Sequence, residues 1–187
     1  MDFLTTLRDV GACFDALGCR WAVIGALAAG IHGVPRTTVD IDALIDGAIA
    51  SRLDLLLADL GYTVTFRWEE SSHFSSPRPD RCPLDFLHAR RPHTLAMLDR
   101  AKRVELGGTG LLTPVVEVED LIGLKVQALV NDPDRRRGEL VDIRALFEAA
   151  AARGVRLDCK RVWEYFALFG EEREYDELLK GLKDAVS

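Results

Sequence analysis

An excess of positive charge, paired cysteines and long apolar runs are all missing from this sequence. The four cysteines show no C-x-x-C spacing, which argues against a zinc site and indicates reduced, structural thiols. The formal net charge of -6 argues against broad, sequence-independent nucleic-acid binding, because such binding depends on neutralising phosphates. The longest apolar run, residues 21–31, is too short to span a bilayer, and the first residues lack a basic signal region. We therefore expect a cytoplasmic protein without a membrane partner.

The composition is that of a compact enzyme. The chain has 187 residues, of which 48% are hydrophobic, and this is enough to bury a core as one domain or as a domain with a helical extension. Turn signals and apolar periodicity predict helices over 2–17, 26–32, 50–60 and 94–101. Strands are predicted up to Gly25, around Asp40 to Ile45, around Asp85, and over 62–68, 102–106 and 110–113. A C-terminal bundle of helices is predicted over 117–130, 137–152, 157–168 and 172–184.

Two carboxylates, Asp40 and Asp42, are separated by one apolar residue in a segment that is typical of a buried strand. Residues i and i+2 of a strand point to the same face, about 6 to 7 Å apart. Two partly buried charges of the same sign are unfavourable unless a cation neutralises them. The pair therefore predicts a divalent metal site, and the interleaved apolar residues are expected to face the core: Val39, Ile41, Ala43 and Ile45.

Upstream of this pair, an apolar run changes its period at Gly25 from strand-like to helical. A helix that begins at a glycine exposes free backbone N–H groups and the positive end of its dipole, and both attract phosphate. Gly25 also lets a triphosphate approach the main chain closely. The sequence thus has a candidate phosphate-binding turn at Gly25, followed by the candidate metal-binding pair Asp40 and Asp42. This order favours nucleoside triphosphate chemistry. Gly25 alone is also consistent with a simple strand-to-helix stop.

The sequence contains a glycine, a small residue, about a dozen further residues and then Asp-x-Asp. This pattern resembles the signature of the polymerase-beta-like nucleotidyltransferase superfamily. Residues 23–28 and 32–42 are most similar to the AbiEii-like nucleotidyltransferases, many of which are toxins of toxin–antitoxin pairs. The second motif position in that superfamily is usually Ser or Gly. Here it is Ala26, so a hydroxyl contact to phosphate is absent.

The resemblance also implies a third carboxylate on a neighbouring strand. Asp85 is the only acid in an apolar segment of strand type, which makes it the candidate, although an edge-strand acid is the alternative. By resemblance, Asp40 and Asp42 would hold two Mg²⁺ (or Mn²⁺) ions. Asp85 would hold the catalytic ion and help to deprotonate the attacking hydroxyl. Two cations of this kind stabilise the attacking and leaving oxygens of a phosphoryl displacement.

Two helical residues, Lys125 and Asp142, match positions that complete the nucleotide pocket in AbiEii-like proteins. Lys125 would neutralise triphosphate charge, and Asp142 would orient the lysine or bind the acceptor side. The alternatives are a helix lysine that extends to solvent and an ion pair between Asp142 and a nearby arginine. Arg36, in the loop before the acid pair, is either a phosphate ligand or a solvated loop residue. His73 either approaches the site or is an ordinary hairpin histidine.

The resemblance implies an α+β (α/β) fold, with a mixed sheet flanked by helices over residues 1–115 and a helical extension over 116–187 that completes the pocket. The implied activity is transfer of a nucleoside monophosphate from an NTP to a hydroxyl of a tRNA 3′ end or a protein, with an antitoxin as a partner. An acceptor RNA could contact the basic residues at 90–91 and 135–137, which are equally consistent with solvated loops. The alternatives are a small-molecule (antibiotic) acceptor, a catalytically degenerate binding protein, and a hydrolase.

Overall fold

The computed structural model describes residues 2–186. Its α-helices are Phe3–Ala16 (α1), Gly25–Ile31 (α2), Leu53–Ala58 (α3), Pro92–Arg100 (α4), Val118–Asn131 (α5), Arg136–Ala152 (α6), Cys159–Leu168 (α7) and Glu172–Val186 (α8). Its strands are Trp21–Val23 (β1), Ile41–Asp46 (β2), Thr63–Arg67 (β3), Ser71–Ser75 (β4), Leu84–Ala89 (β5), Lys102–Glu105 (β6) and Leu112–Val115 (β7). Short 3-10 helices cover Gly47–Arg52 and Pro133–Arg135.

The strands form one mixed seven-stranded sheet in the order β3-β4-β5-β2-β1-β7-β6. Two neighbouring pairs are parallel, β2 with β5 and β1 with β7, and the other four pairs are antiparallel. The parallel pairing of β2 with β5 brings together two segments that are about forty residues apart in the sequence. The predicted α+β fold with a mixed sheet and flanking helices is confirmed.

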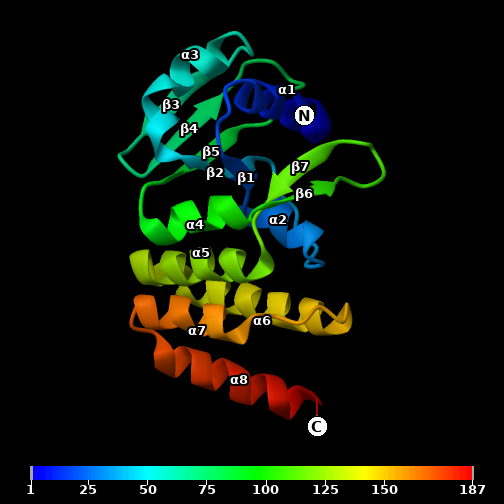
Figure 1. Cartoon of the computed structure of the whole chain (residues 1–187), viewed down its shortest axis with the longest axis vertical. Helices are drawn as coiled ribbons and strands as arrows, with labels where there is room; N and C mark the ends of the chain where they lie inside the picture. The colour runs from blue at the N-terminus through cyan, green and yellow to red at the C-terminus, as the bar shows by residue number, and fades with distance from the viewer. Residues whose placement is uncertain (1, 187) are drawn as a thin grey trace. The chain divides into compact units, whose positions relative to one another are not determined.

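The chain divides into two compact units. The first comprises residues up to Ala28 together with Arg36–Glu117 and contains the whole sheet. In this unit α1 and α3 lie on one side of the sheet and α4 on the other (Figure 1). On the α1 side, aromatic rings pack edge to face between the helix and the sheet. The centroid of the Phe14 ring lies 5.7 Å from those of both Trp21 and Phe86.

The second unit comprises Ala29–Pro35 and residues from Val118 onward. Its centre is α5, which packs against α6 and α7 and buries residues on almost every side. Gly123 on α5 permits a close approach, because a Cβ there would lie 2.7 Å from the ring of Tyr165. The hydroxyl of Tyr165 donates a hydrogen bond of 2.8 Å to the buried Asp120. Among residues 2–186, no helix has both the length and the apolar character needed to cross a bilayer.

Two local predictions are wrong. Val39 does not face the core and is 64% exposed, because β2 begins only at Ile41 and the preceding residues form a loop. Asp40 consequently lies just before the strand and not within it. The segment around His73, which lies between two predicted strands in the sequence, forms a strand of its own, β4, between β3 and β5. Its serine-rich sequence has a weak local preference for strands, and pairing on both sides stabilises it there.

Candidate functional site

Asp42 and Asp85 are register partners on the adjacent parallel strands β2 and β5. Partners in register point to the same face of a sheet, and neighbouring strands lie about 4.8 Å apart. Both residues are half-buried, whereas their strand neighbours Ile41 and Leu84 are buried. The structure therefore brings together two of the three carboxylates that the sequence singled out.

Gly25 provides the space that the carboxylate of Asp42 occupies. A Cβ on Gly25 would lie only 2.0 Å from Oδ2 of Asp42, and the glycine has a φ of +62°, which other residues rarely adopt. The backbone N–H of Ile24 also donates to the carbonyl of Asp42 at 3.0 Å. The start of α2, with Ala26 as its second residue, is therefore fixed directly against the acid-bearing strand.

Asp40 and Arg36 lie in the loop that leads into β2. The Asp40 carboxylate is half-buried and accepts a hydrogen bond from the hydroxyl of Thr38, while Arg36 is exposed. Within residues 2–186, no three His, Cys, Asp or Glu side chains form a group arranged to hold a metal ion. The metal-binding roles of Asp40, Asp42 and Asp85 and the phosphate role of Arg36 thus stay predictions.

The donor set nevertheless suits a hard divalent cation. Carboxylate oxygens are the ligands that Mg²⁺ prefers, and one or two carboxylates with substrate phosphates commonly complete its coordination. Asp42 and Asp85 supply two such groups from neighbouring strands that hydrogen-bond to each other. These residues would hold the ion.

His73 contacts the candidate site in a way that the sequence did not establish. It is the register partner of Asp85 on β4, and its Nδ1 lies 2.7 Å from Oδ1 of Asp85. The side chains are 42% and 29% exposed, so the pair is reachable from solvent. In the structure, half-buried Ser71, His73 and Ser75 alternate with buried Ser72 and Phe74. The serine-rich sequence itself gave only a weak signal for this strand.

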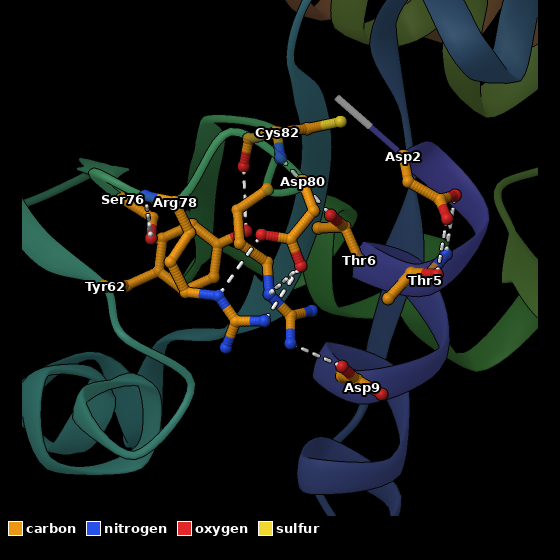
Figure 2. Close-up of polar contacts among 10 residues, drawn as sticks. Asp2, Thr5, Thr6, Asp9, Tyr62, Ser76, Arg78, Asp80 and Cys82 are labelled. Carbon is orange, nitrogen blue, oxygen red and sulfur yellow. Dashed lines mark hydrogen bonds and ion pairs between the residues drawn. The ribbon is translucent and has the colours of Figure 1, made fainter.

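The loop that precedes β5 is held in place by α1. The hydroxyl of Thr6 accepts a 3.2 Å hydrogen bond from the N–H of Cys82, and the carbonyl of Cys82 accepts one of 2.8 Å from the hydroxyl of Tyr62 (Figure 2). The guanidinium of Arg81 is almost fully buried and pairs with Asp9 at 2.6 Å. The carbonyl of Pro83 then accepts from the N–H of Ile41 at 2.9 Å, which fixes the register of β5 against β2.

Lys125 and Asp142 are brought together in the helical unit. The Lys125 ammonium donates to Asp142 at 2.6 Å and to Glu139 at 3.0 Å, and all three side chains are largely buried. Sequence reasoning missed Glu139, although its position three residues before Asp142 on α6 places both acids on one helix face. Arg135 completes the cluster through an ion pair with Glu139. Lys125 is thus an ion-pair partner of Asp142.

No protein-family model matches the chain, and no curated protein is detectably similar to it in sequence. Solved structures do match its fold. The solution structure of the antibiotic-resistance factor ANT(2'')-Ia is similar over 99% of this chain and 100% of that one, with a TM-score of 0.62 and 17% identity. An antigenic nucleotidyltransferase-like protein from Paracoccidioides brasiliensis matches over 95% and 91%, with a TM-score of 0.59 and 17% identity.

A third structure, the lincosamide antibiotic adenylyltransferase LnuA with bound lincomycin, matches 78% of this chain and 96% of its own, with a TM-score of 0.53 and 13% identity. Identities this low establish the fold and nothing finer. The fold of the chain is therefore that of the nucleotidyltransferases.

Proposed function

We propose that the chain transfers a nucleoside monophosphate from an NTP to a hydroxyl acceptor. The observation that carries this proposal is the pairing of Asp42 with Asp85 on parallel strands, with Asp42 seated over Gly25 at the start of α2. Two carboxylates from different strands beside an exposed main chain suit a metal-bound triphosphate. The nucleotidyltransferase fold of the neighbours supports the same reaction class.

In the proposed reaction, the acceptor oxygen forms a bond to the α-phosphorus while the bond to the leaving pyrophosphate breaks. Bound Mg²⁺ would supply charge neutralisation at the phosphates, held by Asp42 and Asp85 with Asp40 as the third carboxylate. Asp85 would take the proton of the acceptor hydroxyl, and His73, whose Nδ1 lies 2.7 Å from Oδ1 of Asp85, would hold that carboxylate in position. Positioning the reactants is the larger part of the work in such a transfer.

The acceptor class is the finer part of the proposal. The resemblance to AbiEii-like proteins supports a tRNA 3′ end or a protein acceptor, with an antitoxin as partner. The match with ANT(2'')-Ia over essentially the whole of both chains favours a small-molecule acceptor instead, since that protein has been solved in complex with adenylyl-2''-tobramycin. We place the small-molecule acceptor first and keep the RNA and protein acceptors as the second candidate.

The test is an acceptor screen. The full chain is incubated with each α-labelled NTP and Mg²⁺, in separate reactions containing tobramycin, lincomycin, total RNA or cell lysate. We expect label in an acceptor from at least one NTP, and none with Asp42→Asn. Equal labelling by wild type and Asp42→Asn would contradict the assigned site. No labelling in any reaction, and no release of phosphate, would contradict the proposal and support a binding role. Phosphate release without a labelled acceptor would indicate a hydrolase.

A further inference from the structure

A line of side chains runs from the acid pair to the edge of the sheet. Asp42 on β2 is the register partner of Asp85 on β5, Asp85 is that of His73 on β4, and His73 is that of Phe66 on the edge strand β3. Register partners share a face, so four consecutive strands present these residues side by side. The row begins at the candidate catalytic acids and ends at an aromatic ring.

Direct contacts connect the members of this row. His73 is hydrogen-bonded to Asp85 at 2.7 Å, and its ring meets that of Phe66 edge-on, with centroids 5.2 Å apart and an interplanar angle of 67°. Trp68 extends the aromatic end by two residues, and its N–H donates to the carbonyl of Ser71 at 2.8 Å, which keeps it paired with β4. Trp68 follows the last residue of β3, and its bond to Ser71 continues the register beyond the pair of Arg67 with Ser72, which places Trp68 on the same side as Phe66.

These aromatic rings are open to solvent. Phe66 is 51% exposed and Trp68 is 69% exposed, whereas the opposite face of β4 is closed by Ser72 and Phe74. We call the open side of the β3–β4 hairpin the hairpin face, defined by Phe66, Trp68, Ser71, His73 and Ser75. Rings flanked by short hydroxyl side chains provide apolar contact and hydrogen bonding on one surface, which suits a ligand that is itself both apolar and hydroxylated.

The charges near the hairpin face disfavour a polyanion. Two of the arginines beside it are already paired with carboxylates, because Arg67 pairs with Asp54 and Arg91 pairs with Glu70 at 2.7 Å. An RNA strand binds mainly through cations that neutralise its phosphates. The electron-rich ring faces of Phe66 and Trp68 instead attract a positively charged group, and they can also stack against a neutral ring.

We propose that the hairpin face is the acceptor subsite, and that Phe66 and Trp68 stack against a neutral or cationic, hydroxyl-bearing ring of a small acceptor. The inference rests on the proposed nucleotidyl transfer and deepens it, because the row delivers the acceptor hydroxyl beside Asp85. Stacking on two rings determines which acceptor binds, while Asp42 and Asp85 carry out the chemistry.

The experiment follows the indole N–H signals of Trp21, Trp68 and Trp163 by NMR in the full ¹⁵N-labelled chain, with assignments from single Phe substitutions. Tobramycin, lincomycin and a short oligoribonucleotide are titrated separately, in wild type and in Asp42→Asn. We expect tobramycin or lincomycin to shift the Trp68 signal and leave Trp21 unchanged. Phe66→Ala and Trp68→Ala should each weaken that binding about tenfold, the equivalent of about 1.4 kcal/mol. The matched control is Trp163→Ala, which replaces another half-exposed tryptophan and should leave the affinity unchanged.

Any of three results would overturn the inference. These are no shift of the Trp68 signal with tobramycin or lincomycin, a shift with the oligoribonucleotide alone, and an affinity that is unchanged in Trp68→Ala. The experiment distinguishes a failure of the subsite from a failure of the proposed function. Nucleotide transfer that is equally efficient in wild type and Trp68→Ala leaves the function standing and removes the subsite. A Trp68 shift by tobramycin or lincomycin without transfer supports the subsite and removes the activity.

Discussion

The imidazole of His73 lies 2.7 Å from the carboxylate of Asp85, although the two residues are on antiparallel strands and twelve positions apart in the sequence. A hydrogen bond to a charged group contributes about 1.5–3 kcal/mol. We expect His73→Leu to lower kcat about tenfold while the KM for the NTP changes little, because Asp85 loses its orientation but the phosphate site is intact. His73→Asn, which can still donate, should recover most of kcat. Steady-state kinetics decide the matter, and a fully active Leu variant would contradict the positioning role.

The like charges of Asp42 and Asp85 should make the site a weak point in stability. Like charges directly opposite on neighbouring strands destabilise a sheet by about 0.2–1 kcal/mol. We therefore expect Asp42→Asn, which leaves the hydrogen bond of His73 to Asp85 in place, to raise the free energy of unfolding by up to about 1 kcal/mol and to abolish transfer. Urea unfolding measures the first effect. Asp54→Asn, which removes a partner from Arg67, should show no such gain. A loss of stability in Asp42→Asn would contradict the repulsion.

Gly25 and Gly18 form a matched pair, because their φ angles are +62° and +61° but only Gly25 has a neighbour at the position of a Cβ. Gly18→Ala should cost about 1 kcal/mol from backbone strain alone and leave the activity intact. Gly25→Ala adds a clash with Asp42, so we expect a larger loss of stability and a loss of transfer. Thermal unfolding and the transfer assay of both variants test this. Equal effects would show that the close approach to Asp42 is unimportant.

The cluster of Lys125 with Asp142 and Glu139 is buried, so its disruption leaves carboxylates without their cation. We expect Lys125→Met to lower the free energy of unfolding by about 3 kcal/mol. Lys160→Met, at an exposed ion pair with Glu164, should have little effect. Adding Asp142→Asn to Lys125→Met should restore part of the stability.

The same variants test the predicted nucleotide role of Lys125. Lys125→Arg keeps the charge and is the variant to assay. A KM for the NTP that rises at least tenfold in Lys125→Met but not in Lys125→Arg would support contact with the triphosphate. An unchanged KM in a folded Lys125→Met would assign the lysine to the ion-pair cluster alone.

His88 should make the fold sensitive to acid. Burial lowers its pKa below the usual value, and the charges of Arg90 and Arg67 lower the pKa further, against a hydrogen bond with the carbonyl of Glu69 that raises it. The unfolded chain therefore takes up a proton at a higher pH than the folded one, so stability is complete above about pH 6.5 and falls as the pH drops toward the folded-state pKa. Urea unfolding at pH 7.5, 6.5 and 5.5 should show this slope. His88→Gln should flatten it, and an unchanged slope would assign the acid sensitivity to other groups.

Much of the fold followed from local patterns. The helices of the C-terminal unit and the strand around Asp85 were predictable, because apolar periodicity and turn residues mark them. The strand β4 was not, because Ser71, Ser72 and Ser75 have little strand preference and the pairing with β3 and β5 decides its conformation. The exposure of Val39 was missed for a related reason, since the start of β2 depends on the partner carbonyl of Pro83.

The sequence by itself determined the order of the chemistry-bearing residues, with Gly25 before the two acids and Asp85 after them, since spacing and residue type are properties of the chain alone. Only the tertiary structure decided that Asp85 lies opposite Asp42 and that His73 and Phe66 continue the same row. Hydrogen bonds between strands far apart in the sequence set that register, and a shift of one residue would turn every one of these side chains to the other face.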